Sequence, residues 1–245
     1  MSQFESYAAY YDLLYNDKDY QGEADYIEKK IKAYAPDTKK IIELGCGTGI
    51  HAQLLFQKGY DITGVDISEG MIERAKERNP ELHFICDNIQ TFSVDERVDT
   101  ILALFHVVSY QTTIKELINT IKNVRTHLKE GGLFLFDVWH GPAVMTIKPD
   151  TKVKRLKKGK LKVTRIAEPT QDFEASCVDV SYQIFINDDS IYSEINEVHR
   201  MRYFFKTELE ILFKQFDMEI VHSEKWLDEE VPSENSWGVL YAVRN

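Results

Sequence analysis

The chain has 245 residues, of which 43% are hydrophobic and 29% charged, and its formal net charge is −10. This composition is typical of a soluble globular protein that is long enough for an ample α/β core. It excludes a bilayer-spanning helix, which needs about 20 consecutive apolar residues, and its acidic balance opposes general attraction to nucleic acid or anionic membrane. The first residues lack the basic start and apolar middle of a signal peptide, and the 3 scattered cysteines predict neither a disulfide framework nor a metal site. We therefore expect a cytoplasmic protein without a bound metal.

The N-terminus carries large apolar side chains at the spacing of one helix face. They are Phe4, Tyr7, Tyr11, Leu14 and Tyr15. Such a stripe is more often core packing than part of a ligand site, and both interpretations stay open at this point. A second helix is predicted from Tyr20 to about Tyr34, with Pro36 beyond its end.

The run from Ile41 to Gly49 is the most informative stretch of the chain. It reads Ile-Ile-Glu-Leu-Gly-Cys-Gly-Thr-Gly, an apolar run that stops in glycines at alternate positions, and it predicts a strand, a tight turn and a helix start. Glycine allows the main chain to approach a ligand closely. A dinucleotide fingerprint would need a further glycine at Ile50, so a diphosphate cofactor such as NAD is disfavoured. A second apolar run ends in Asp66, about 20 positions after the first glycine, near the offset at which an acid meets ribose hydroxyls.

Further apolar runs alternate with helical patterns up to His140, which predicts a parallel sheet. These strands are expected at 82–86, 98–104 and 133–137. Gly131 and Gly132 predict the end of the helix before the last of them, while Thr113 and Thr207 each begin a T-x-x-E capping box and predict helix starts. Ligands bind at the carboxyl ends of parallel strands. The residues that follow the runs are therefore site candidates, namely Asp87, Asn88, Phe105, His106 and His140.

Beyond residue 147 the pattern changes to two hairpins, one around Lys158-Gly159 and one around Asp188-Asp189. They predict a small antiparallel sheet over 148–206, inserted between the core segments 36–147 and 207–245. The last core elements are a helix after Thr207 and strands at 218–226 and 237–243. The segment from Lys148 to Arg165 carries a net charge of about +8, unlike the rest of the chain.

The run Glu43-Leu-Gly-Cys-Gly-Thr-Gly49, together with Asp66, resembles motif I and the ribose-binding acid of class I S-adenosylmethionine-dependent methyltransferases. The resemblance covers residues 41–140 and implies a Rossmann-like, seven-stranded α/β fold with S-adenosyl-L-methionine as cofactor. It implies cofactor contacts from Tyr15, Glu43, Gly45, Cys46, Gly47, Asp66, Ile67, Met71, Asp87, Asn88, Ile89, Ala103 and Phe105. The run Tyr10-Tyr-Asp-Leu-Leu-Tyr15 is similar to the N-terminal lid of amino-sugar N-methyltransferases, so residues 1–35 are expected to form a helical lid.

The function that this resemblance implies is N-methylation of a nucleotide-linked amino sugar by in-line methyl transfer. Tyr15, His106 and His140 are the candidates for removing the proton of the acceptor amine. An O-methyltransferase of a sugar or other metabolite, a tRNA-modifying methyltransferase, a non-catalytic binding protein for the cofactor and an NAD-type oxidoreductase are the alternatives. The acidic charge disfavours a nucleic acid partner, and the sequence leaves a homodimer open. The basic segment, with His140 and the His199-Arg200 pair, is expected to contact the diphosphate of the acceptor.

Overall fold

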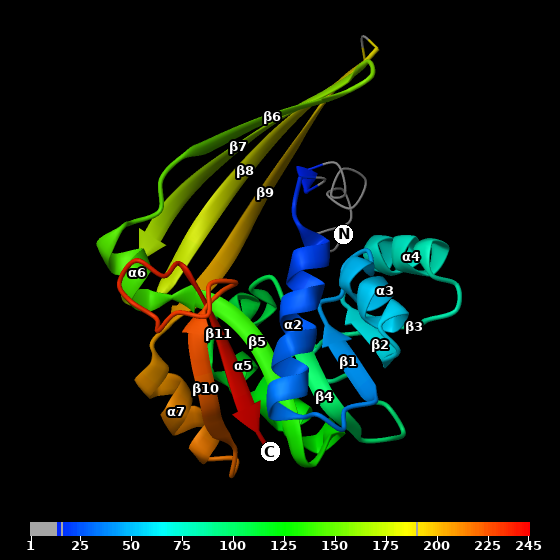
Figure 1. Cartoon of the computed structure of the whole chain (residues 1–245). Helices are drawn as coiled ribbons and strands as arrows, with labels where there is room; N and C mark the ends of the chain where they lie inside the picture. The colour runs from blue at the N-terminus through cyan, green and yellow to red at the C-terminus, as the bar shows by residue number, and fades with distance from the viewer. Residues whose placement is uncertain (1–13, 16, 190) are drawn as a thin grey trace.

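The computed structural model of the chain describes residues 14, 15, 17–189 and 191–245. Its centre is a twisted sheet whose parallel strands lie in the order β3-β2-β1-β4-β5 (Figure 1). Antiparallel β11 pairs with β5, and β10 pairs with β11. The strands are β1 (Lys40–Leu44), β2 (Asp61–Asp66), β3 (His83–Cys86), β4 (Val98–Ala103), β5 (Leu128–His140), β10 (Glu219–Lys225) and β11 (Gly238–Arg244). The predicted parallel sheet and its antiparallel finishing strand are both present.

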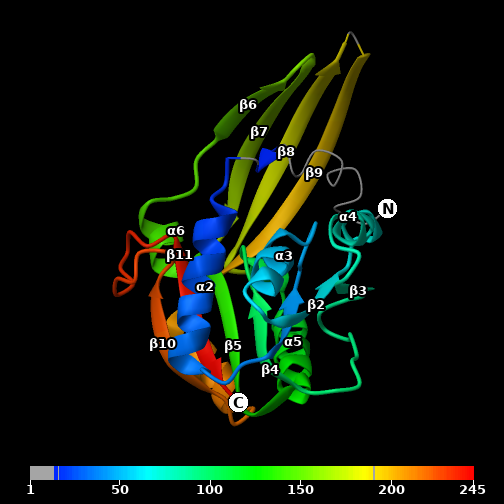
Figure 2. The same cartoon turned by 45° about the vertical axis from the view of Figure 1, so that its right-hand side comes forward.

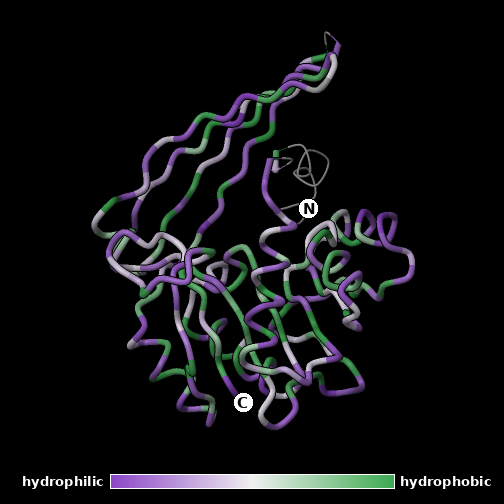
Figure 3. The backbone as a smooth tube through the Cα atoms, viewed as in Figure 1, coloured by the Kyte–Doolittle hydropathy of each residue, from purple (hydrophilic) through white to green (hydrophobic). Residues whose placement is uncertain are grey.

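Helices cover both faces of this sheet. On one face α2, α3 and α4 pack against the strands, and on the other face α5 and α7 do so. The bounds are α2 (Tyr20–Tyr34), α3 (Ile50–Gln57), α4 (Glu69–Arg78), α5 (Ile114–His127), α6 (Gly141–Thr146), α7 (Lys206–Lys214) and the short 3-10 helix η1 (Val107–Tyr110). Figure 3 shows hydrophobic residues concentrated in the central strands, as expected of strands buried on both faces. None of the helices in the described part of the chain combines the length and hydrophobicity needed to cross a bilayer.

A side chain caps the starts of α2, α4 and α5, whereas α3, α6 and α7 begin without such a cap. Thr113 and Glu116 form the predicted reciprocal capping box at α5, and the Ser68 hydroxyl accepts a bond from the Met71 N–H at α4. The capping box predicted at Thr207 is wrong, because α7 begins at Lys206 after an N-cap residue, Phe205, that makes no side-chain bond. The predicted helix end at Gly131-Gly132 is also displaced. The helix stops at His127, and these glycines lie inside the long strand β5, near an irregularity in its pairing with β4.

The segment after α6 forms four long antiparallel strands that rise from the body as an arm (Figure 1 and Figure 2). They are β6 (Lys152–Lys158), β7 (Leu161–Asp172), β8 (Cys177–Asp188) and β9 (Ile191–Phe204). The arm is larger than the small sheet expected from the sequence, and it is continuous with the central sheet. The connection is parallel pairing of Trp139 with Tyr203 and of His140 with Phe204. We refer to β6–β9 as the arm below.

A buried polar cluster fastens α2 to the far edge of the sheet. The carboxylate of Glu224 on β10 accepts bonds from the Tyr26 hydroxyl, the Lys30 ammonium at 2.7 Å and His222 Nε2 at 2.7 Å. Glu224 is 3% exposed. Burial opposes its ionisation, but the bonds from Lys30, Tyr26 and His222 outweigh this and hold its pKa below the ordinary value.

Candidate active site

A cavity of about 670 Å³ lies where the carboxyl ends of β1, β2 and β4 face the base of the arm. Its body wall comes from the turns after these strands, and its opposite wall comes from β8 and β9. This is the edge at which open α/β sheets bind ligands, at the point where the strand order reverses. Within the described residues no group of three or more histidine, cysteine or acidic side chains could hold a metal ion.

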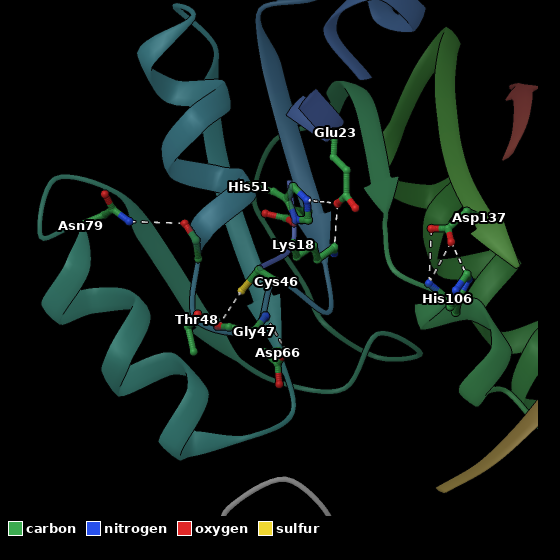
Figure 4. A network of polar contacts seen from close by, with 12 residues as sticks. Lys18, Glu23, Cys46, Gly47, Thr48, His51, Asp66, Asn79, His106 and Asp137 are labelled. Carbon is green, nitrogen blue, oxygen red and sulfur yellow. Dashed lines mark hydrogen bonds and ion pairs between the residues drawn. The ribbon is translucent and has the colours of Figure 1, made fainter. Parts of the chain in front are cut away.

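The glycine turn after β1 lines the cavity on the side of the central sheet. Gly45 and Gly47 have φ angles of 63° and 53°, which favour glycine. A Cβ atom on Gly45 would lie 2.3 Å from Val107, whereas one on Gly47 would meet nothing within 4 Å, so the main chain at Gly47 is open to a ligand. The Asp66 carboxylate accepts the Gly47 N–H at 2.8 Å and the Ser68 N–H at 2.9 Å and thereby holds the turn (Figure 4). Burial raises the pKa of Asp66, although these two bonds act against the rise.

A buried charged network links the start of α2 to the glycine turn. Glu23 contacts Lys18 Nζ at 3.0 Å and His51 Nε2 at 2.7 Å, and His51 Nδ1 lies 3.6 Å from Glu43 (Figure 4). Burial alone would lower the pKa of His51, but Glu23 and Glu43 more than offset this and raise it. Lys18 and His51 line the cavity and Glu23 and Glu43 do not, so the basic members of the network are the ones that reach the cavity surface.

Aromatic side chains surround the opposite end of the cavity. Tyr15 packs edge-on against Phe105 at a centroid distance of 5.2 Å, and Trp139 packs edge-on against Trp237 at 5.5 Å. The ammonium of Lys18 lies 3.6 Å from the centroid of the Phe105 ring. Aromatic faces attract cations. The Lys18 ammonium therefore already occupies a face of the Phe105 ring and joins this aromatic cluster to the Glu23 network.

The arm contributes polar groups to the same end. His199, which is 3% exposed, contacts the Tyr110 hydroxyl with Nδ1 at 2.9 Å and the Glu197 carboxylate with Nε2 at 3.0 Å. The Arg165 guanidinium donates to the Tyr15 hydroxyl at 3.2 Å and thereby joins the arm to the segment before α2. Burial raises the pKa of Tyr110 well above its ordinary value, so this phenol stays protonated at neutral pH.

His106 lies between these walls, directly after β4. Its Nδ1 atom is 2.6 Å from Oδ2 of Asp137, and its backbone N–H points to the same carboxylate at 3.2 and 3.3 Å (Figure 4). The ring contact is short but not well aligned for a hydrogen bond, which is common in sites that tighten around a ligand. Asp137 is 1% exposed, whereas His106 lines the cavity.

Part of the chain matches a family of known proteins in sequence. Residues 41–132 match the methyltransferase domain family. The chain contains a methyltransferase domain. It is 22% identical over 223 residues to a dTDP-3-amino-3,4,6-trideoxy-alpha-D-glucopyranose N,N-dimethyltransferase of Streptomyces venezuelae, covering 89% of this chain and 92% of that one.

Solved structures of similar fold cover nearly the whole chain. One is an S-adenosylmethionine-dependent methyltransferase of Clostridium acetobutylicum, with a TM-score of 0.82, 21% identity and 96% of both chains covered. Another is CalS10 of Micromonospora echinaspora, an amino pentose methyltransferase with S-adenosylmethionine bound, with a TM-score of 0.78, 20% identity and 96% of both chains covered. The methyltransferase domain and the arm thus share the fold of these enzymes.

Most residues that the sequence indicated do reach the cavity of the methyltransferase domain. Its lining includes Tyr15, Gly45, Cys46, Gly47, Asp66, Ile67, Met71, Asn88, Ile89, Phe105 and His106. The roles assigned to them stay predictions.

Four of the indicated residues do not line the cavity. Ala103, the last residue of β4, is buried in the sheet, and Leu104 lines the cavity instead. Asp87 turns back to accept the Asn88 N–H at 2.7 Å, so Asn88 lines the cavity in its place. Glu43 lies behind His51. His140 is 7% exposed beside the loop before β11, and burial lowers its pKa; its expected role near the acceptor amine stays a prediction.

The basic segment does not line the cavity either, although its last residue, Arg165, contacts the lining residue Tyr15. Lys152, Lys154 and Arg155 are absent from its lining, and Lys154 pairs with Asp17 at 2.6 Å. Arg200 reaches the lining, but its guanidinium pairs with Asp172 and Asp179. Of the N-terminal stripe, Phe4, Tyr7 and Tyr11 lie outside the described residues, while Leu14 is buried.

Several lining residues were missed by the sequence analysis. Lys18 lies just before α2, Tyr20 and His51 lie in the first turns of α2 and α3, and Tyr110, Tyr182 and Trp237 come from positions far apart in the chain. Only the pairing of distant strands brings the second group to one place, and the sequence carries no local signal for it.

Proposed function

We propose that this protein transfers a methyl group from S-adenosylmethionine to the amine of a nucleotide-linked amino sugar. The Streptomyces venezuelae relative is named for a dTDP-linked amino sugar, and CalS10 is an amino pentose methyltransferase. The observation that carries the proposal is the position of the His106–Asp137 pair in a cavity that runs from an open glycine turn to an aromatic wall.

The residues present fit the cofactor. The Gly47 main chain is open on its cavity side, and Asp66 and Asn88 line the next part of the same wall. We assign Asp66 to the ribose hydroxyls, Asn88 to the adenine, and Lys18 with His51 to the carboxylate of the methionine part. When bound, S-adenosylmethionine supplies the methyl group: the amine lone pair forms the new N–C bond, and the C–S bond breaks with its electron pair remaining on sulfur.

The protein's own task is to orient the acceptor and remove its proton. An amine that is protonated at neutral pH has no lone pair to attack with, so a positioned base contributes to the rate. We assign this role to His106 Nε2, which takes the proton as Nδ1 faces Asp137. Tyr15, placed between Phe105 and Arg165, orients the acceptor against the cofactor. Most of the remaining rate enhancement comes from holding the two reactants in line.

The experiment is a transfer assay with radiolabelled S-adenosylmethionine and a panel of acceptors. The panel contains a dTDP-linked amino sugar, the same nucleotide sugar with a hydroxyl in place of the amine, the free amino sugar and tRNA. We expect labelled methyl only on the nucleotide-linked amine. Label on the hydroxyl analogue or on tRNA would contradict the proposal. The His106→Gln variant tests the assignment of the base. Its control is His83→Gln, which changes an exposed histidine on β3.

A further inference from the structure

Asp137 is an acid inside an apolar strand. It lies on β5, next to Phe136 and Val138, and its partner across the sheet is Leu240 of β11. A buried carboxylate is costly unless it is paired and hydrogen-bonded. Two groups of His106 approach this carboxylate: the backbone N–H, which donates to it at 3.2 and 3.3 Å, and the ring Nδ1, which lies 2.6 Å away but is not aligned for a hydrogen bond.

The backbone at this point is held in an uncommon conformation. Phe105 and His106 are consecutive residues other than glycine with φ angles of 64° and 65°. The left-handed region is disfavoured for such residues and recurs at functional sites, where the surroundings must stabilise it. Here the stabilising group is the carboxylate of Asp137, which receives the His106 N–H. The imidazole is further fixed by stacking on Phe105 at 5.7 Å and by edge contact with Trp139 at 6.2 Å.

We propose that Asp137 is the positioning residue of the reaction and sets the tautomer of His106. A carboxylate can only accept from a neutral imidazole, so Nδ1 carries the hydrogen and Nε2 keeps its lone pair toward the cavity. When Nε2 receives the proton of the acceptor amine, the resulting imidazolium lies beside a fixed negative charge. This inference rests on the proposed function, because it assigns the base of that reaction.

The other titratable groups around this corner have different contacts. Lys18 and Tyr15 lie against Phe105, and Tyr110 contacts His199. Asp137 is thus the charged group that faces the His106 ring among the described residues.

The tautomer can be measured without an acceptor. In protein labelled with ¹⁵N-histidine, the His106 signals are identified by their loss in His106→Gln. We expect the Nδ1-protonated neutral form in the wild type. In Asp137→Asn the side-chain amide can turn either its NH₂ group, which donates, or its oxygen, which accepts, toward His106 Nδ1. We therefore expect the Nε2-protonated form of His106 or a mixture of the two forms. The control is Asp61→Asn, an exposed acid at the start of β2. A wild-type His106 protonated at Nε2 would overturn the inference.

Kinetics then separate a positioning role from a structural one. Asp137→Asn should lower kcat by about 10²- to 10⁴-fold, the range of general base catalysis, and change the dissociation constant of S-adenosylmethionine by less than about twofold. Because two residues that act as a unit are not additive, the double variant with His106→Gln should be no slower than His106→Gln alone. The loss should shrink for an acceptor whose amine is already neutral at the assay pH.

The outcomes distinguish this inference from the proposed function. If the wild type methylates no amino sugar, the proposed function fails, and the tautomer measurement still tests the pairing. If the wild type is active and Asp137→Asn keeps its kcat, the inference fails alone. Additive losses in the double variant would assign Asp137 a structural role and overturn the inference.

Discussion

The Glu224 cluster between α2 and β10 predicts a large loss of stability from a single isosteric substitution. Glu224→Gln keeps the shape of the side chain but removes its charge, and it leaves the Lys30 ammonium, which is 6% exposed, without its nearest counter-ion. Glu229, at 3.5 Å from Lys30, compensates in part. Breaking a buried ion pair from one side costs about 3–5 kcal/mol, a large share of the roughly 5–15 kcal/mol by which domains are stable.

The assay is urea and thermal unfolding of the protein without cofactor. For a chain of this length 1 kcal/mol shifts Tm by about 2–4 °C, so Glu224→Gln should melt about 6–20 °C below the wild type. Glu219→Gln, an exposed position on the same strand, is the matched control. Because the pKa of Glu224 is depressed in the folded state, its contribution is present above the pKa of an unfolded glutamate and is lost as pH falls through the folded pKa. The gap between wild type and variant should therefore close under acidic conditions.

A second variant tests the physical reason. In Lys30→Met with Glu224→Gln no buried charge is left unpaired, so the double variant should be more stable than Glu224→Gln alone. A Glu224→Gln protein whose free energy of unfolding lies within about 0.5 kcal/mol of the wild type would refute the reasoning, since surface changes of no consequence fall in that range. A double variant less stable than the single one would refute the part played by Lys30.

Three further outcomes are expected. Asp66→Ala removes the acceptor of two backbone N–H groups and the assigned ribose contact. Because a charged hydrogen bond is worth roughly 1.5–3 kcal/mol, calorimetry should show a cofactor affinity more than tenfold weaker. An unchanged affinity would contradict the assignment. Tyr15→Phe should lower turnover while Tm stays within about 2 °C, and full activity with every acceptor would return Tyr15 to a packing role. Replacing Lys152, Lys154 and Arg155 together by Ala should leave the acceptor KM unchanged, because none lines the cavity, and a raised KM would restore the diphosphate contact expected from the sequence.

Features with a local cause could be predicted from the sequence. The glycine turn after Leu44 depends on a few adjacent residues, and so does the capping box at Thr113, because the interactions concerned span three or four positions. Even such local signals do not always fix the first or last residue of an element. The chain enters α7 one residue before Thr207. The strand β5 includes Gly131 and Gly132, whose main chains bond to Asn245 where the pairing with β4 is interrupted.

The site could be predicted only in its cofactor half. Strand ends mark that wall, but which residue of a turn faces the cavity depends on backbone angles. Of the predicted pair Asp87 and Asn88 only Asn88 lines the cavity, and Leu104 lines it instead of Ala103. The acceptor half depends on pairing between strands that are far apart in sequence. The sequence predicts Asp137 only as the end of a strand, and its approach to His106 across the sheet is what supports the positioning role that we propose for it.

Among the described residues, strand pairing joins the arm to the central sheet at two positions, Trp139 with Tyr203 and His140 with Phe204. The wall that we assign to the acceptor therefore belongs to a piece of chain that shares little backbone with the wall that we assign to the methyl donor. Over evolution, substitutions on the inner face of β8 and β9 can replace one sugar by another while the donor side stays constant. For the same reason, exchange of 148–206 between homologous enzymes is a route to redirecting acceptor choice by recombination.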